Sequence, residues 1–248
     1  MQTGQAPIGE RLLSAHQSEN PLFGLDSVPF LATSFEDSEK LWAIAEPTIA
    51  KVLDDQNPHY LYAVAWPPQG FYVKKDVNSA ADMKGIKFRS YSTATARIAE
   101  LTGMLPVQIE AAELSQALAT GVAESFIASG ATGYDSKVWE HLTHFYAVDA
   151  WLPRNVVFVN KDVGNGLDAA TQAGINGCAD KAAASGLEKS RTYTQLTLDG
   201  LTAGGMKVQR AGDQLVADLK AIGVTLTAEW LTSAGAEGKA IVDAFSAK

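Results

Sequence analysis

The stretch D-M-K-G-I-K-F-R-S-Y-S-T-A-T-A-R-I-A-E-L, residues 82–101, decides the fold class, because a short apolar strand passes there directly into a helix. We expect the strand over Ile86–Arg89 and the helix from about Thr93 to Thr102, ended by Gly103. A Ser/Thr cluster supplies the hydroxyl side chains that favour a helix start. The arginine between the two elements carries a permanent positive charge, and its position raises the question of what it binds.

The same alternation of strand and helix continues on both sides of this stretch. An amphipathic helix with Ser34 as its expected N-cap comes first, and Pro47 is expected to kink or restart it. The predicted strands cover residues 59–66, 86–89, 106–109, 122–129, 154–160 and 224–227. The predicted helices cover residues 34–56, 93–102, 112–121, 134–146 and 167–201, with a loop at 129–133. This order indicates an α/β protein with largely parallel sheets, and the P-P-Q-G break at 67–70 is a natural place for the chain to change lobes.

The bulk composition excludes several classes of function. A chain of 248 residues, 46% of them hydrophobic, can bury a core as one domain or as two lobes. Its net charge of −8 and isoelectric point near 5.0 argue against nucleic-acid binding, although a local pocket can still hold an anion. No apolar run approaches the roughly 20 residues that span a bilayer, and the first ten residues lack the pattern of a signal peptide. The single cysteine, Cys178, cannot form an internal disulfide, and we expect it to be a buried or half-buried filler of a helix.

Arg89 has the placement of a ligand-binding residue. In an open parallel sheet, ligands gather outside the carboxyl ends of the strands, and Arg89 lies at such an end. The helix start that follows offers hydroxyl groups and unpaired backbone N–H groups, and the planar guanidinium pairs with a carboxylate through two hydrogen bonds. The alternative is a surface arginine paired with a nearby acidic residue. Spacing alone leaves both interpretations open.

Four aromatic residues lie near breaks in the predicted elements: Trp66, Tyr72, Tyr91 and Trp151. Taken singly, each fits ordinary packing. Taken together around the Arg89 region, they make an apolar pocket with a charged anchor plausible.

Motifs of catalysis and of metal binding are absent from the sequence. His141 and His144 lie three residues apart, but no third ligand is placed as in H-E-x-x-H. The chain also has no G-x-S-x-G elbow, no G-x-G-x-x-G and no P-loop. We therefore expect no metal, no cofactor and no catalytic residue.

Several stretches together resemble one protein family. The motif D-M-K-G-I-K-F-R is similar to the D-L-K-G-x-K-x-R strand of solute-binding proteins of tripartite ATP-independent periplasmic (TRAP) transporters, the DctP-like family. The resemblance extends through V-P-F-L at 28–31, L-Y-A-V-A-W-P-P-Q-G, A-E-L-S-Q-A-L-A-T-G-V-A-E and W-L-P-R-N-V-V-F-V-N-K at 151–161. It implies an α/β, two-lobed periplasmic-binding-protein-like fold with a hinge and a long lobe-spanning helix. By this analogy, residues 1–68 and 153–195 form lobe one, and residues 69–152 and 196–248 form lobe two.

The resemblance also implies a function. The chain would capture a small organic acid in the periplasm and deliver it to integral-membrane TRAP transporter subunits, with Arg89 pairing with the ligand carboxylate. The residues expected to line the site are Arg89, Tyr72, Trp66, Tyr91, Ser92, Ser129, Thr132, Trp151 and Asn155. Many relatives carry a second arginine where this chain has Tyr72, and a G-Q-E-N-P segment where it reads E-S-F-I-A-S-G-A-T-G. A monocarboxylate with an apolar or aromatic body therefore fits better than a sialic acid or a C4-dicarboxylate.

The start of the chain departs from the family pattern. Relatives begin with a signal peptide and a strand–helix–strand unit before a segment like Q-T-G-Q-x-P-I-G, and this chain starts at that segment. We therefore expect lobe one to lack an N-terminal part. A shortened lobe would expose apolar sheet and make the 248-residue product unstable or sticky.

Two rival functions remain at this stage. An enzyme on the same scaffold would use Arg89 to orient an acidic substrate, with Glu113 or Glu124 as the candidate general base. A sensory module would pass ligand occupancy to a signalling partner. Turnover of a bound acid would support the enzyme, and a gene neighbourhood without transporter subunits would support the sensor.

Overall fold

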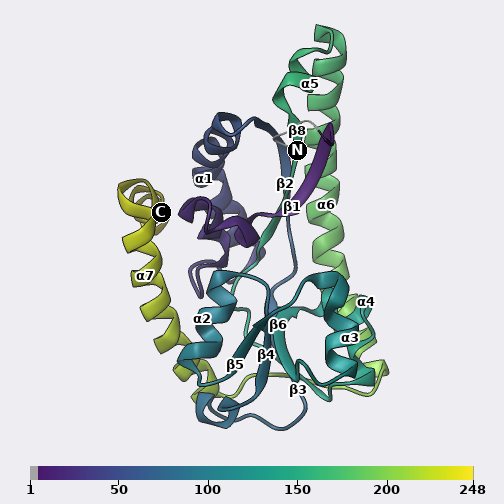
Figure 1. The fold of residues 1–248 in the computed structure, drawn as a ribbon, viewed down its shortest axis with the longest axis vertical. Coiled ribbons are helices and arrows are strands. Elements are labelled where there is room, and N and C mark those ends of the chain that lie inside the picture. The colour runs from purple at the N-terminus through teal and green to yellow at the C-terminus, as the bar shows by residue number, and fades with distance from the viewer. Residues whose placement is uncertain (1–4, 248) are drawn as a thin grey trace.

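The computed structural model describes residues 5–247 and contains two β-sheets flanked by helices (Figure 1). The smaller sheet has three strands in the order β1 (Ile8–Leu12), β8 (Arg154–Asn160) and β2 (Pro58–Ala65). Its helices are η1 (Leu13–His16), η2 (Pro21–Ser27), α1 (Phe35–Asp55) and α5 (Lys161–Asn165). Ser34 caps α1 by accepting a hydrogen bond from the backbone N–H of Asp37, as predicted, and α1 continues through Pro47 as one helix.

The larger sheet has six strands, and it carries Arg89. Their order is β5 (Leu105–Gln108), β4 (Lys87–Ser90), β6 (Ser125–Ser129), β3 (Gln69–Val73), β7 (His144–Ala147) and β9 (Lys207–Arg210). Its shorter helices are η3 (Ala80–Met83), α2 (Thr93–Leu101), η4 (Ala111–Glu113), α3 (Leu114–Ala119), α4 (Gly130–Asp135) and η5 (Val138–Glu140). Successive side chains of β3 point to opposite faces of the sheet, so Phe71 packs into one hydrophobic core and Tyr72 into another.

In each sheet, one strand directly follows a strand of the other sheet along the chain. β3 follows β2 after a short break and runs antiparallel to β6 and β7, while β8 follows β7 and runs antiparallel to β1 and β2. The parallel pairs are β4 with β5, β4 with β6, and β7 with β9. The smaller sheet is therefore antiparallel and the larger sheet is mixed, so the expectation of largely parallel sheets is wrong.

Two long helices connect the sheets on opposite sides of the molecule (Figure 1). The helix α6 (Ala169–Ala203) contacts β2 of the smaller sheet and α4 of the larger, which confirms the predicted lobe-spanning helix. The helix α7 (Asp213–Ser246) packs Leu215 and Leu219 into the core of the larger sheet. Its later residues Trp230 and Ile241 pack instead with α1 and η2, so α7 is not confined to the second expected lobe.

Four local predictions differ from the structure. The predicted loop at 129–133 contains the start of α4, which Ser129 caps. Residues 134–146 are not a helix: α4 ends at Asp135, Lys137 has a positive φ of 49°, and β7 follows because its aromatic residues complete the larger sheet. Residues 224–227 lie inside α7, since Leu226 continues a buried helical face. Cys178 is exposed on α6 rather than buried. Among residues 5–247, no helix combines the length and the apolar character needed to cross a membrane.

Candidate functional site

The site lies where two chain segments cross side by side between the sheets. The backbone N–H of Trp66 donates to the carbonyl of Pro153 at 2.8 Å, and that of Gln69 donates to Trp151 at 3.0 Å. Ala150 donates back to Gln69 at 3.2 Å. These bonds give the crossing a fixed register, so side chains from both sheets keep fixed positions around it.

Arg89 projects from the end of β4 and is only 4% exposed. Its Nε–H donates to the carbonyl of Ile109 at 2.8 Å, and its guanidinium lies 5.1 Å from the centre of the Tyr91 ring. Burial lowers the pKa of Arg89, and the charge of Glu110 opposes this effect without forming an ion pair. Because no carboxylate of residues 5–247 pairs with Arg89, the interpretation as a surface arginine with an acidic partner is wrong. A buried cation without a counter-ion is costly unless an anion arrives from outside.

Tyr91 and Gln69 connect Arg89 to the crossing. The Tyr91 hydroxyl donates to Oε1 of Gln69 at 3.2 Å, and Nε2 of Gln69 donates to the carbonyl of Pro67 at 3.0 Å. Burial raises the pKa of Tyr91, so its phenol stays protonated. Trp151, 1% exposed, belongs to the same buried cluster as Tyr91, and its indole N–H has no hydrogen-bond partner within the described chain.

Asp26 lies on the smaller-sheet side of the site and is not among the residues predicted from the sequence. Its Oδ2 accepts a hydrogen bond from the backbone N–H of Arg154 at 2.7 Å, and its Oδ1 accepts one from the Ser27 hydroxyl at 3.0 Å. Enclosure by protein raises the pKa of Asp26 to about 6, although these bonds and the Arg154 charge act in the opposite direction. The charge of Asp26 in turn helps to raise the pKa of Tyr91, so the two side chains are close enough to interact electrostatically.

The Arg154 side chain explains why Asp26 receives so little charge compensation. Its guanidinium is 2% exposed, donates to the Ser38 hydroxyl at 3.0 Å and pairs with Glu39 at 2.5 Å. It also lies 5.1 Å from the ring centre of Trp42. Arg154 is thus committed to α1, and only its backbone N–H bonds to Asp26.

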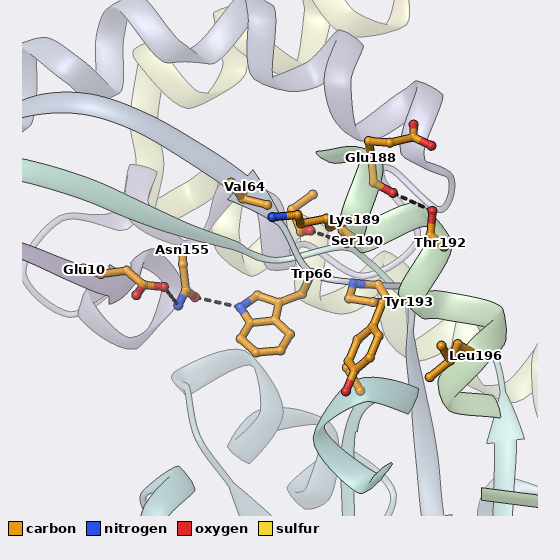
Figure 2. Close-up of a pocket in the computed structure, with 13 residues that line it drawn as sticks. Glu10, Val64, Trp66, Asn155, Glu188, Lys189, Ser190, Thr192, Tyr193 and Leu196 are labelled. Atoms are coloured by element: carbon orange, nitrogen blue, oxygen red, sulfur yellow. Dashed lines mark hydrogen bonds between the residues drawn. The ribbon is translucent and has the colours of Figure 1, made fainter. Parts of the chain in front are cut away.

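A pocket of about 520 Å³ opens beside the crossing (Figure 2). Its polar wall is a chain of hydrogen bonds in which Trp66 Nε1 donates to Asn155 Oδ1 at 2.7 Å and Asn155 Nδ2 donates to Glu10 at 2.6 Å. Tyr193 of α6 also lines the pocket and donates its hydroxyl to Asp135 of α4 at 2.6 Å. The remaining lining residues are Val64, Ala65, Pro67, Ala131, Glu188, Lys189, Ser190, Thr192 and Leu196. Strands of the smaller sheet, α4 of the larger and the connecting α6 all contribute to this pocket.

The structure brings together some of the predicted site residues and places others in structural roles. Arg89, Tyr91 and Trp151 belong to the buried side of the crossing, while Trp66 and Asn155 share the pocket wall. Tyr72 is fully buried, stacks on Phe126 with ring centres 4.3 Å apart, and donates its hydroxyl to the Ser129 carbonyl. Tyr72 is therefore a core residue and does not replace a second arginine in the pocket.

The predicted hydroxyl residues cap helices. The Ser92 hydroxyl accepts from the N–H of Thr95, while Thr95 Oγ1 accepts from the N–H groups of Tyr91 and Ser92. Ser129 caps α4 by accepting from the N–H of Thr132. Much of the donor capacity expected at the start of α2 is thus used within the protein.

Two residues of the site had signals in the sequence that were not recognised. Asp26 lies two residues before the V-P-F-L motif, and Gln69 lies in the P-P-Q-G break. Neither signal reveals a partner, because Asp26 bonds to a residue 128 positions away and Gln69 to one 22 positions away.

The structure shows the surroundings of the residues considered for catalysis or metal binding. Glu113 is exposed at the end of η4, and the backbone N–H of Glu124 pairs with Lys87. Nδ1 of His144 bonds to the Thr143 hydroxyl, and His144 Nε2 lies 3.0 Å from Asp76. Within residues 5–247, no three His, Cys, Asp or Glu side chains are grouped so that they could hold a metal ion.

Comparisons with known proteins agree on one kind of protein. Residues 1–231 match the model of the family described as bacterial extracellular solute-binding protein, family 7 (DctP). No curated protein matches the chain.

Solved structures give close matches. A TRAP solute-binding protein from an unidentified marine microbe, specific for pyroglutamate, is 55% identical with a TM-score of 0.98, covering 100% of this chain and 81% of that one. DctP6 from Bordetella pertussis, an extracytoplasmic solute receptor binding pyroglutamic acid, is 41% identical with a TM-score of 0.97, covering 100% and 82%. DctP7 from the same organism, with the same ligand, is 40% identical with a TM-score of 0.97, covering 99% and 81%.

Proposed function

The chain belongs to family 7 of the bacterial extracellular solute-binding proteins, and from this premise we propose that it captures a small organic acid and delivers it to the membrane subunits of a TRAP transporter. The acid would bind between the two sheets, beside the crossing segments. The observation that carries the proposal is Arg89, a guanidinium only 4% exposed with no counter-ion from residues 5–247. A ligand carboxylate supplies the missing negative charge.

We further propose that the ligand is pyroglutamate or a closely related cyclic monocarboxylate. Three similar proteins, at 40–55% identity, are described as binding pyroglutamate or pyroglutamic acid. One buried arginine, Arg89, has no counter-ion within residues 5–247 and suits one carboxylate, and the rings of Tyr91, Trp151 and Trp66 suit a small ring. This ligand is narrower than the monocarboxylate with an apolar or aromatic body that the sequence predicts.

Binding would be coupled to closure of two lobes about the crossing segments. We propose that residues 1–68 and 153–195 form one lobe and residues 69–152 the core of the other, with α6 and α7 connecting them. A ligand that touches Arg89 on one side and the smaller sheet on the other favours the closed state, since its contacts with both lobes exist only there. The membrane subunits would then recognise the closed form outside the cytoplasm.

Binding without turnover is the expected chemistry. The proteins of this family and the similar solved structures are solute-binding proteins. The bound acid should leave the protein unchanged after prolonged incubation.

Isothermal titration of the purified chain with pyroglutamate, succinate and glutamate tests the proposed function. We expect saturable one-to-one binding of pyroglutamate and a rise in melting temperature, because a ligand at 100 times its Kd adds about 2.7 kcal/mol to stability. Succinate and glutamate should bind much more weakly. Binding of succinate with no binding of pyroglutamate would overturn the assignment of the ligand, and conversion of pyroglutamate would overturn the assignment as a binding protein.

A further inference from the structure

We propose that Asp26 accepts a hydrogen bond from an N–H group of the bound acid, so that the site selects carboxylates that also carry an N–H donor. This inference rests on the proposed function and adds a second recognition element to the same site. The lactam N–H of pyroglutamate is a donor of this kind, adjacent to the carbon that bears the carboxylate.

The Asp26 carboxylate has unused hydrogen-bonding capacity. A carboxylate offers about four acceptor positions. The described structure uses two of them, for the backbone N–H of Arg154 and the hydroxyl of Ser27. Asp26 is half-buried as a residue, and no hydrogen bond within residues 5–247 occupies the remaining positions.

The charges around the site form a complementary pair that is not internally neutralised. Within residues 5–247, Asp26 has no ion-pair partner, because the Arg154 guanidinium pairs with Glu39. Arg89 has none either, and the two do not pair with each other. Both lie close enough to Tyr91 for their charges to affect its pKa. A ligand with a carboxylate and an adjacent N–H donor would satisfy both groups at once.

The surroundings of Asp26 hold it in place before any ligand arrives. It is part of η2, whose neighbouring residues Leu25, Ser27 and Val28 are each at most 2% exposed. Its partner Arg154 is anchored through a guanidinium bound to α1. A fixed acceptor is more selective than a mobile one, because the protein pays no further ordering cost on binding.

A purely structural role does not account for the carboxylate. An asparagine could accept the Arg154 N–H with its amide oxygen and donate from its amide nitrogen to the Ser27 hydroxyl oxygen, without placing a charge in an enclosed position. Asp26 keeps the charged form at a cost, which its raised pKa of about 6 reflects. Such a cost is expected where charge serves binding.

Two ligands of nearly the same shape test this inference directly. Pyroglutamate and its lactone analogue, 5-oxotetrahydrofuran-2-carboxylate, differ in the ring N–H, which is a ring oxygen in the lactone. The wild-type chain should bind the lactam at least about 20-fold more tightly, as expected for one charge-assisted hydrogen bond in an enclosed site. Asp26→Asn should reduce the ratio of lactam affinity to lactone affinity to about threefold or less, chiefly by weakening lactam binding.

Asp168→Asn is the matched control, since Asp168 also accepts from a backbone N–H and a hydroxyl, both of Thr171, but lies at the start of α6. It should keep the wild-type ratio. A wild-type ratio near one, or an unchanged ratio in Asp26→Asn, overturns the role of Asp26 while leaving pyroglutamate binding intact. If the wild-type chain binds neither compound, the proposed function itself fails, and this inference fails with it. The wild-type ratio decides the question even if Asp26→Asn does not fold.

Discussion

Asp26 and Arg154 are joined by a backbone hydrogen bond of 2.7 Å, yet their side-chain charges do not pair. The guanidinium of Arg154 pairs instead with Glu39, and Asp26, half-buried as a residue, lies at the crossing between the sheets. Across the site, Arg89 is likewise buried without a counter-ion from residues 5–247. One cation and one anion near the crossing thus have no ion-pair partner within residues 5–247.

Asp26→Asn should stabilise the ligand-free protein at neutral and alkaline pH. The pKa of Asp26 is about 6 in the folded protein against 3.8 normally, so between these values the folded state holds a proton that the unfolded chain has released. Stability therefore falls as the pH rises through this window and stays reduced above it. Removing the carboxylate should raise the free energy of unfolding at pH 8 by up to about 3 kcal/mol. Screening by solvent at the half-buried side chain makes this increase smaller.

Thermal melts of wild type and Asp26→Asn at pH 4 and pH 8 measure this difference. The gain should be present at pH 8 and should shrink at pH 4. Asp168→Asn serves as the control of opposite sign, because hydrogen bonds from Thr171 lower the pKa of Asp168. A loss of stability for Asp26→Asn at pH 8 would show that the carboxylate stabilises the fold.

Ligand affinity should weaken as the pH falls below about 6. A protonated Asp26 loses the negative charge that attracts an N–H donor, while Arg89 stays protonated and still binds the carboxylate. The other groups that face Asp26 are the backbone N–H and guanidinium of Arg154, the Ser27 hydroxyl and the phenol of Tyr91, whose pKa is raised by burial. Titrations with pyroglutamate across this range should show the decline in wild type.

The variant Asp26→Asn supplies the comparison for this pH dependence. Its affinity should be lower but nearly constant between pH 5 and pH 8. A wild-type affinity that is constant over the same range would contradict the assignment of Asp26 as the titrating acceptor.

Tyr72→Phe should reduce stability without affecting ligand affinity. The Tyr72 hydroxyl donates to the buried Ser129 carbonyl at 2.8 Å, and the ring is fully buried between Phe126 and Phe145. Loss of this bond leaves the carbonyl without that donor and should cost about 1–2 kcal/mol. Chemical denaturation measures the loss, and titration should give a Kd within about twofold of wild type. A large loss of affinity at unchanged stability would return Tyr72 to the ligand site.

Local sequence patterns predicted the elements that carry Arg89 and the crossing strand β8, but not the other crossing strand, β3. The strand and helix around Arg89 depend on neighbouring residues, and both are present as β4 and α2. β3 begins at Gln69, inside the P-P-Q-G break, without a pattern of its own, and its strand state depends on pairing with β6 and β7. Residues 224–227 have β-branched side chains, yet they lie in α7 because Leu226 packs into the core of the larger sheet.

Contacts between residues far apart in the sequence also determine the candidate site. Arg89 is predicted as a ligand residue by its position at the end of a strand together with the family resemblance, because its position alone leaves a surface role open. Asp26 could not be predicted, because its importance arises from Arg154, 128 residues later, committing its guanidinium to Glu39. Tyr72 was assigned to the site because of its position after the break, and only the pairing of β3 shows that it faces a core.

The most direct test of the account is the titration of pyroglutamate into Arg89→Met beside wild type. Loss of the guanidinium should weaken binding at least about 100-fold, because two charge-assisted hydrogen bonds are lost and the ligand charge enters an enclosed site unpaired. Melting of the ligand-free variant should remain cooperative, since Arg89 makes one hydrogen bond within residues 5–247, to the carbonyl of Ile109. Arg89→Met that melts cooperatively and still binds pyroglutamate within about threefold of wild type would contradict the central claim that Arg89 holds the ligand carboxylate.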